Sequence, residues 1–321
     1  MIVDEFVAPS PSESEMAARR KARRRRMMLR NLEGWLFASP WILGLVAWFL
    51  LPMGASIYLS LTSYNIVEPP YYVGLGNYGE MLEDPLIWQA LKVTTVYTEL
   101  TKMQAKHILI LLAMLLNQKI KGLAMWRTIY YLPSVVSGVA VALLWEWLFN
   151  GRFGLVNYLL DAGLGIQGPN WLADTRTAIW AFVVIRVWMV GGSMLINLAA
   201  LQGVPTALYE AAEIDGANAW HKLIHVTIPM ISPVIFFNLV MGIIGALKSF
   251  DLFYIMTGGG PNNTTLTFML HLYRTAFEYM RMGYGCAMAW LLFAYLVMLT
   301  AIVFRSSSTW VHYESSRRKG A

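Results

Sequence analysis

The sequence predicts an all-α, polytopic membrane protein with six transmembrane helices. Hydrophobic residues make up 57% of the 321 residues and charged residues only 14%, whereas charged residues make up about 25% of an average soluble domain. The mean hydropathy is +0.49. The apolar residues also gather in six runs of about 20 residues, the length that a helix needs to cross a hydrocarbon core of about 30 Å.

The six predicted spans are, in chain order, residues 41–61, 93–116, 129–149, 178–200, 230–250 and 286–304. The second span contains charged residues, and Glu99, Lys102 and Lys106 fall on one helical face. Because a charge facing lipid is unfavourable, we expect this face to point into protein or water. It is either a mutually paired structural cluster or a positive surface that attracts an acidic sugar or a phosphorylated polyol.

Lysine and arginine indicate the orientation of the chain. Most of those outside the spans lie before the first span, in the second and fourth loops, and after the last span. Cytoplasmic segments are enriched in these residues, so both termini are predicted to be cytoplasmic. The net charge of +6 is then explained by the membrane orientation of the chain, and no nucleic-acid partner is needed to account for it. We expect a flexible basic tail over residues 1–34, a transmembrane domain over 35–305 and a second tail over 306–321.

Metal and disulfide chemistry find little support in the sequence. Cys286 is the only cysteine, so an internal disulfide is excluded. The five histidines show no metal-ligand spacing, and His221 and His225 lack an evident third ligand. No metal site is predicted.

The fifth loop, which is predicted to lie outside the cell, contains a turn followed by a helix. Residues 258–263 read Gly-Gly-Gly-Pro-Asn-Asn, which predicts a tight reversal. Beyond it, apolar residues recur at spacings of three and four, which predicts an amphipathic helix along the outer surface; these are Met269, Leu272, Tyr273, Ala276, Phe277 and Met280.

The fourth loop, residues 203–229, is predicted to be a cytoplasmic helical hairpin, called here the fourth-loop hairpin. Pro205 suits a helix start, and Asp215-Gly216 suits a left-handed helix end. Leu208, Ala211 and Ala212 form a narrow face that another surface can approach closely, with Glu210 and Glu213 beside it as partners for basic residues. We expect Pro229 to end the second helix. The hairpin therefore has the features of a docking element.

The spacing in this hairpin resembles the signature of the membrane subunits of ABC importers. That signature is Glu-Ala-Ala, three residues, Gly, nine residues, Ile, one residue and Leu-Pro; Glu210-Ala211-Ala212, Gly216 and Pro229 match it, with Val226 and Ile228 replacing the Ile and Leu. Further segments resemble the carbohydrate-uptake branch, of the maltose and glycerol-phosphate type. They are residues 74–78, 130–133, 170–172, 198–202 and 250–261.

The resemblance implies a type I ABC importer permease fold in a bacterial or archaeal cytoplasmic membrane. It implies a second homologous permease, two ATPase subunits and an extracellular or periplasmic solute-binding protein as partners. The residues expected to couple to the ATPase are Glu210, Ala211, Ala212, Asp215, Gly216 and Pro229. The chain lacks a phosphate-binding Gly-x-x-x-x-Gly-Lys-Ser/Thr loop. No catalytic residue or cofactor is therefore expected, and ATP and Mg would be bound by the partner ATPase.

The resemblance also places a substrate pathway beside the fifth span. There Gly242, Gly245, Ala246 and Ser249 form a stripe of small residues on one helical face. Such a stripe indicates either close helix packing or a ligand groove. Arg186 in the fourth span is expected to extend toward the outer interface.

The expected cargo is a sugar, an oligosaccharide or a glycerol-phosphate-like polyol. One alternative is an ABC importer permease for a non-sugar solute, which would share the hairpin. Another is a secondary transporter driven by an ion gradient, which would place ionisable residues at mid-membrane in several spans. Here those residues concentrate in one span and near helix ends.

Overall fold

The computed structural model describes residues 13–116 and 122–312, except for the side chains of residues 13–26, 29 and 103–116. The described part is almost entirely helical, as predicted. Its elements are α1 Glu13–Leu45, η1 Val46–Leu50, α2 Leu51–Ser60, β1 Thr62–Ser63, β2 Tyr71–Tyr72, α3 Gly76–Glu83, α4 Pro85–Leu116, α5 Leu123–Tyr131, η2 Leu132–Val135, α6 Gly138–Leu148, α7 Leu155–Leu164, α8 Ala178–Trp188, α9 Gly191–Gln202, α10 Thr206–Ile214, α11 Ala219–Lys222, η3 Leu223–Thr227, α12 Ile228–Leu247, α13 Asp251–Met256, α14 Phe268–Tyr273, η4 Arg274–Glu278 and α15 Met282–Ser307.

The chain divides into two units, residues 1–58 and 59–321. In the first unit, helix α1 continues through the π-turn η1 into α2, and residues Arg30–Ser60 are long and apolar enough to cross a membrane. The predicted tail differs from the structure, because the chain is helical from Glu13 onward. This segment is rich in alanine, arginine and methionine, which favour helix. Residues 1–12 lie outside the described part.

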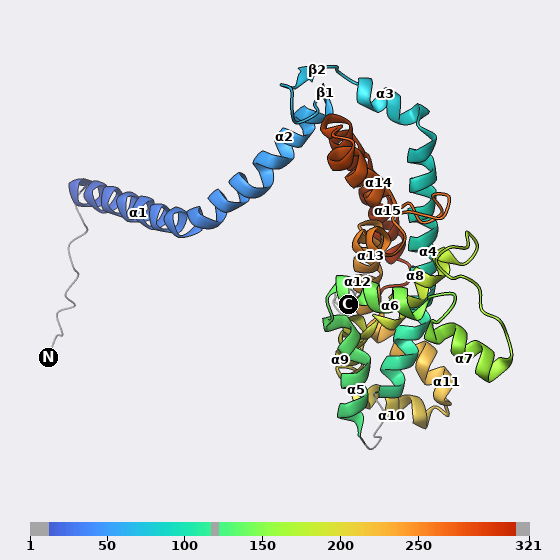
Figure 1. Cartoon of the computed structure of the whole chain (residues 1–321). Coiled ribbons are helices and arrows are strands. Elements are labelled where there is room, and N and C mark those ends of the chain that lie inside the picture. The colour runs from blue at the N-terminus through green and yellow to red at the C-terminus, as the bar shows by residue number, and fades with distance from the viewer. Residues whose placement is uncertain (1–12, 117–121, 313–321) are drawn as a thin grey trace. The chain divides into compact units, whose positions relative to one another are not determined.

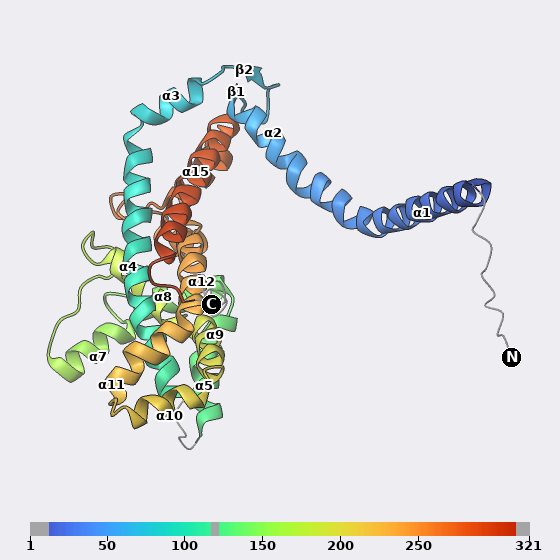
Figure 2. The same ribbon diagram turned by 180° about the vertical axis from the view of Figure 1, so that it is seen from behind.

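In the second unit, long helices connect two ends. Figures 1 and 2 place α10 and α11 at one end, and the β1–β2 pair and α3 at the opposite end, with α4 running between them. The two strands pair antiparallel, Thr62 with Tyr72 and Ser63 with Tyr71. Helix α15 starts at the β1–β2 end, and α12 starts at the α10–α11 end. The fourth-loop hairpin thus lies at the end opposite the strand pair.

The fifth and sixth predicted spans are confirmed as long apolar helices, Ala219–Met256 and Met282–Ser307. The second predicted span lies in α4, but the side chains of its second half are outside the described residues. The third and fourth spans are not the continuous helices that we expected. Each is a bent pair: Leu123–Val135 and Gly138–Leu148 meet at 101°, and Ala178–Trp188 and Gly191–Gln202 meet at 43°.

A proline accompanies the first break, and a close contact with a distant segment accompanies the second. Pro133 lies in the 3₁₀ turn η2 and provides no backbone N–H to continue the helix. At the other break, Gly191 packs directly against the backbone of the first pair. A Cβ on Gly191 would lie 2.0 Å from the carbonyl oxygen of Tyr130. The bend of the second pair therefore contacts the first pair at the end of α5.

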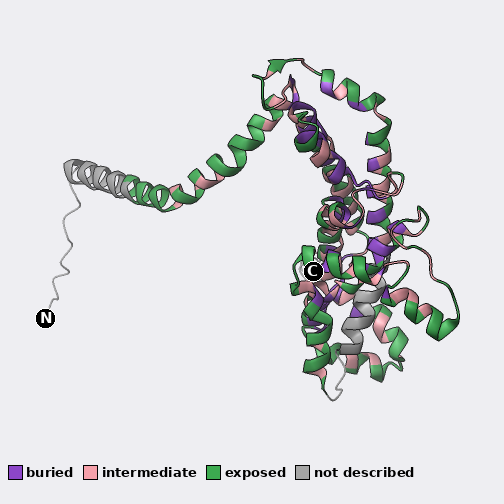
Figure 3. Cartoon of the chain, in the orientation of Figure 1, coloured by how far each residue is buried: buried purple, intermediate pink, exposed green. Residues whose placement is uncertain are grey.

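The core of the second unit lies where α4, α8, α13, α14 and α15 meet, and Figure 3 shows buried residues concentrated along these helices. Phe253 is fully buried at its centre. Its ring stacks on Phe182 with centroids 4.0 Å apart and meets the edge of Tyr97 at 5.0 Å. These aromatic contacts join helices that are remote in the sequence.

Candidate functional site

The fourth-loop hairpin forms the turn that its sequence predicts. Gly216 has a φ of 77°, the left-handed conformation that favours glycine. The N–H of Ala217 donates to the carbonyl of Ala212 at 2.9 Å, and the N–H of Gly216 donates to that of Glu213 at 3.0 Å. This is the complete pattern of a Schellman helix end. The hairpin therefore has a defined bend between α10 and α11.

The second helix of the hairpin does not end at Pro229, contrary to the prediction. Asn218 caps its start, accepting from the N–H of His221 at 2.9 Å. Helix α11 then continues through the π-turn η3 into α12, and Pro229 lies in the first turn of α12. In the π-turn the N–H of Ile228 donates to Leu223. Because this wider turn changes the hydrogen-bond pattern just before Pro229, the proline is tolerated within the helix.

The hairpin is anchored to two membrane helices. Tyr209 on α10 is half-buried, and its hydroxyl lies 3.1 Å from the Thr227 hydroxyl. Tyr209 packs against a small core that contains Leu201 in α9, Val204 just after α9 and Ile231 in α12. A displacement of α10 would therefore be transmitted to both α9 and α12.

The two glutamates of the hairpin differ in their surroundings. Glu213 is paired with Lys222 on α11, with Oε1 and Nζ 2.6 Å apart. Glu210 is exposed and makes no ion pair or hydrogen bond with any residue in the described ranges. Of the two carboxylates, Glu210 is the one available to a cation from another chain.

The hairpin also exposes large apolar residues, and the sequence analysis missed two of them, Ile214 and Trp220. Ile214 is 87% exposed and Trp220 is 65% exposed, and Leu208 is also exposed. Ala211 is exposed, whereas Ala212 is half-buried. Large apolar side chains that point away from the protein at a helix turn indicate an interaction surface. Their position on both sides of the Gly216 bend was the signal available in the sequence.

The small-residue stripe of α12 has an interior part and an open part. Ala246 is buried in the core, and the Ser249 hydroxyl donates to the carbonyl of Gly245 at 3.1 Å. Gly242 is exposed, and a Cβ on it would meet nothing within 4 Å. The stripe is thus neither a continuous packing surface nor a continuous groove.

Arg186 lies against the fifth predicted span. Its Nη2 atom lies 3.1 Å from the position that a Cβ on Gly245 would occupy, so the guanidinium lies against α12. On the second span, Glu99 and Lys102 pair at 2.6 Å, as the structural interpretation of that face predicted. The side chain of Lys106 lies outside the described residues.

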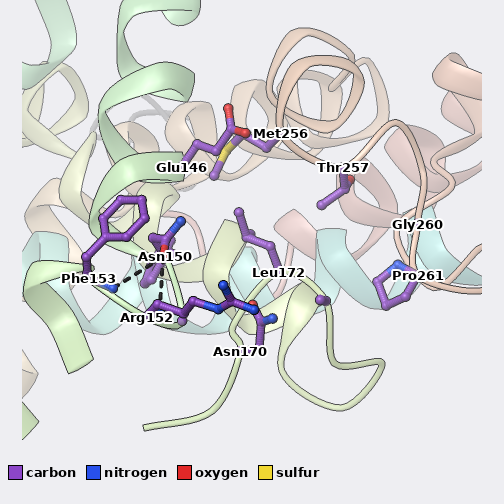
Figure 4. A pocket seen from close by; sticks show the side chains of 13 residues that line it. Glu146, Asn150, Arg152, Phe153, Asn170, Leu172, Met256, Thr257, Gly260 and Pro261 are labelled. Atoms are coloured by element: carbon purple, nitrogen blue, oxygen red, sulfur yellow. Dashed lines mark hydrogen bonds between the residues drawn. The ribbon is translucent and has the colours of Figure 1, made fainter.

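A cavity of about 730 Å³ opens between the third and fifth loops (Figure 4). Its walls are held by local hydrogen bonds: the Asn150 side chain accepts from the N–H of Arg152 at 3.0 Å, and Thr257 bonds Thr265 at 2.7 Å. Glu146 and Arg152 lie on different sides of it in Figure 4. No motif in the sequence predicted this cavity, because it joins segments that are about 100 residues apart.

A polar cluster ties the first outer loop to α14 and α15. Arg281 pairs with Glu80 at 2.6 Å, and the Tyr284 hydroxyl donates to Asp84 at 3.2 Å. His271 of α14 is buried, with Nε2 3.9 Å from Asp84. Burial lowers the pKa of His271, and the Asp84 carboxylate opposes that shift.

Helix α14 is therefore packed inside the fold, and the prediction that it lies along the outer surface is wrong. Its buried face contains Phe268, Leu270 and His271. Phe277 and Met280, which we assigned to the apolar face, are exposed. The tight reversal before α14 is confirmed, with positive φ at Gly258, Gly259, Asn262 and Asn263.

Metal-binding geometry is absent among the residues that the structure describes, where no three His, Cys, Asp or Glu side chains converge. His221 and His225 are stacked with ring centroids 5.9 Å apart. Neither has a third ligand within the described ranges.

Comparison with known proteins identifies the family. Residues 109–312 match the family model described as binding-protein-dependent transport system inner membrane component. The probable ABC transporter permease protein YesP of Bacillus subtilis is 42% identical over 290 residues, which is 89% of this chain and 93% of YesP. The probable starch degradation products transport system permease protein AmyD of Thermoanaerobacterium thermosulfurigenes is 32% identical over 270 residues, 84% of this chain and 91% of AmyD.

A solved structure has the same fold. The match is to a chain in the crystal structure of a bacterial alginate ABC transporter in complex with an alginate pentasaccharide-bound periplasmic protein, with a TM-score of 0.78 and 21% identity. It covers 88% of this chain and 96% of the other. From the family match and the extent of these similarities, the chain belongs to the inner membrane components of binding-protein-dependent transport systems, the ABC importer permeases.

Proposed function

We propose that this chain carries a carbohydrate across the inner membrane and that the fourth-loop hairpin couples this movement to ATP hydrolysis in separate ATPase subunits. The observation that carries the proposal is the construction of the hairpin. It is fixed to α9 and α12 on one side, and on the other it presents exposed apolar side chains and the Glu210 carboxylate, which has no partner in the described structure.

Each proposed coupling residue has a physical role. Glu210 forms an ion pair with a basic residue of the ATPase. The small side chains of Ala211 and Ala212 allow the ATPase surface to approach the backbone of α10 closely. Asp215 and Gly216 form the bend that keeps α10 and α11 in one rigid unit. Pro229, beside the π-turn η3, marks the point where hairpin motion passes into α12. Closure of the ATPases would then pull on α9 and α12 together.

The assembly that this role requires comprises a second homologous permease, two ATPases that bind ATP and Mg, and an extracellular or periplasmic solute-binding protein. The family description supports the binding protein, since transport in this family depends on one. Residues 35–305 would be the permease domain, and 1–34 and 306–321 cytoplasmic tails. Supporting this, the N–H of His312 after α15 donates to Ser232 at the hairpin end of α12, at 2.9 Å.

A carbohydrate cargo is supported by AmyD, whose name assigns it to starch degradation products. The pathway would pass the α12 stripe of Gly242, Gly245, Ala246 and Ser249, where Gly242 leaves open space. A non-sugar solute would use the same hairpin. An ion-gradient mechanism would need no exposed ATPase contact, so the hairpin surface argues against it.

The test is Glu210→Lys in the complete importer, reconstituted with its binding protein. Reversing this charge should lower both solute-stimulated ATP hydrolysis and uptake at least about tenfold, because charge-assisted contacts across an interface contribute about 1.5–3 kcal/mol. Glu213→Gln is the matched control. It removes a carboxylate that Lys222 already neutralises, so transport should change by less than about twofold, since exposed ion pairs contribute about 0–1 kcal/mol.

Full transport by Glu210→Lys in an assembled complex would contradict the coupling role. Uptake in proteoliposomes that needs no ATP but follows a proton or sodium gradient would contradict the ATP-driven mechanism as a whole. Identifying the solute on the co-purified binding protein decides between a carbohydrate and another cargo.

A further inference from the structure

We propose that Arg186 is the charge-selecting residue of the permeation pathway and binds an anionic group, a carboxylate or a phosphate, on the transported saccharide. The inference rests on the proposed function, because it assumes that a saccharide passes the outer part of α12. It goes beyond that function by naming the class of cargo.

Arg186 lies well within the membrane-spanning region. It is the ninth of the eleven residues of α8, just before the break between α8 and α9. A cation exposed to lipid at the centre of a membrane costs roughly 2.5–3.5 kcal/mol even on the most lenient scale. A charge at this depth therefore calls for a partner or for water.

The described part of the chain supplies no such partner. Arg186 makes no ion pair or hydrogen bond with any residue of the described ranges, although other cations of this unit do: Lys102 with Glu99 and Arg281 with Glu80. The first two acidic residues after α12 in the sequence are Asp251 and Glu278. Neither pairs with Arg186 in the described structure, and Glu278 pairs with Arg274. The guanidinium is left available to a charge from outside the chain.

The groups that the structure places beside the Arg186 guanidinium are neutral. Gly245 provides the space for the guanidinium, since a Cβ there would lie 3.1 Å from Nη2. The buried Tyr97 lies within the electrostatic reach of Arg186, and its hydroxyl interacts with the Ser249 side chain. Tyr97 is fully buried and Ser249 is half-buried, so the groups beneath the guanidinium are neutral hydroxyls that supply no counter-charge.

The chemistry of arginine then favours an anion. The guanidinium presents its donors in a planar fork that matches the two oxygens of a carboxylate or phosphate. A neutral sugar would leave the charge uncompensated at low dielectric. The carboxylate or phosphate of an acidic saccharide would compensate it.

The experiment measures ATP-dependent uptake by the complete importer in proteoliposomes with its binding protein. Three probes are compared: disaccharides of hexuronic acids, hexose phosphates, and the same disaccharides after carboxyl reduction, each first checked for binding to the binding protein. The uronate and phosphate probes separate the two sources of anionic oxygen. We expect an anionic probe to be carried and Arg186→Gln to lower its uptake at least about tenfold.

Two variants show that charge, and not packing, is responsible. Arg186→Lys keeps the charge and should recover a large part of the uptake that Arg186→Gln loses. Lys248→Gln removes an exposed cation from the residue that follows α12 and should leave uptake of the anionic probe within about twofold.

The proposal is overturned if only neutral saccharides are carried, or if Arg186→Gln lowers uptake of neutral and anionic probes alike. It is also overturned if that variant dissociates the second permease, because Arg186 would then be an intersubunit contact. Uptake of neutral sugars leaves the proposed function standing, whereas ATP-driven uptake of a non-saccharide alone would overturn both.

Discussion

At the scale of single residues, the neighbouring glycines Gly191 and Gly192 differ in whether they can accept a side chain. The three atoms nearest to a Cβ on Gly191 would all be backbone atoms: the Tyr130 oxygen at 2.0 Å, and the Tyr130 carbon and Tyr131 Cα at 2.8 Å. Backbone cannot rotate away as a side chain can. A Cβ on Gly192 would meet the Ser134 side chain at an ordinary 3.8 Å.

Gly191→Ala should therefore destabilise the protein by about 1–3 kcal/mol or more through overpacking, while Gly192→Ala should leave its stability nearly unchanged. Thermal unfolding of the complex in nanodiscs, with the yield of assembled complex, measures both. Equal unfolding temperatures for the two variants would show that the bent pairs do not contact each other as described.

The two glutamates of the fourth-loop hairpin differ in a way that their sequence positions do not show. The sequence offers Glu210 and Glu213 as equivalent charge partners three residues apart. Only the fold distinguishes them, because the Gly216 bend brings Lys222 to within 2.6 Å of Glu213. A contact nine residues away in sequence thus decides which of the two exposed carboxylates remains unpaired.

At the scale of elements, α14 connects the outer segments through His271. The titratable and charged groups around it are Asp84, which lies between α3 and α4, Tyr284 of α15 and Arg274 of η4. Burial lowers the pKa of His271 below its usual value of about 6.5. The unfolded chain then binds more protons than the folded chain as the pH falls below about 6.5, so stability falls with pH in that window.

His271→Gln should reduce this loss of stability between pH 6.5 and 5, as measured by the unfolding temperature of the complex across the range. The control is His221→Gln on the fourth-loop hairpin, where the exposed side chain is expected to leave the pH dependence as in the original protein. An unchanged slope in His271→Gln would place the acid-sensitive group elsewhere.

At the scale of the whole molecule, the charge distribution predicts an orientation that can be measured. With Cys286→Ser as background, single cysteines are introduced by Glu33→Cys, Asp161→Cys and Ser308→Cys, all at exposed positions. A membrane-impermeant maleimide on intact right-side-out vesicles should label only the Asp161→Cys protein. In inverted vesicles it should label the other two. The reverse pattern would contradict cytoplasmic termini.

The sequence by itself determined the class of fold, the places of the spans, the hairpin and its left-handed bend at Gly216. These depend on apolar run length, charge and local backbone preference, all of which are properties of short segments. The spacing of Glu210, Gly216 and Pro229 also indicated the family that the comparisons identify.

Only the tertiary structure decided the bends of the third and fourth spans, the continuation of the helix past Pro229 and the inward packing of α14. It also placed the Arg186 guanidinium against Gly245. Each of these depends on which distant segment lies alongside, such as Tyr130 against Gly191. Local propensity carries no information about such neighbours, because close packing and charge compensation arise only when remote parts of the chain meet.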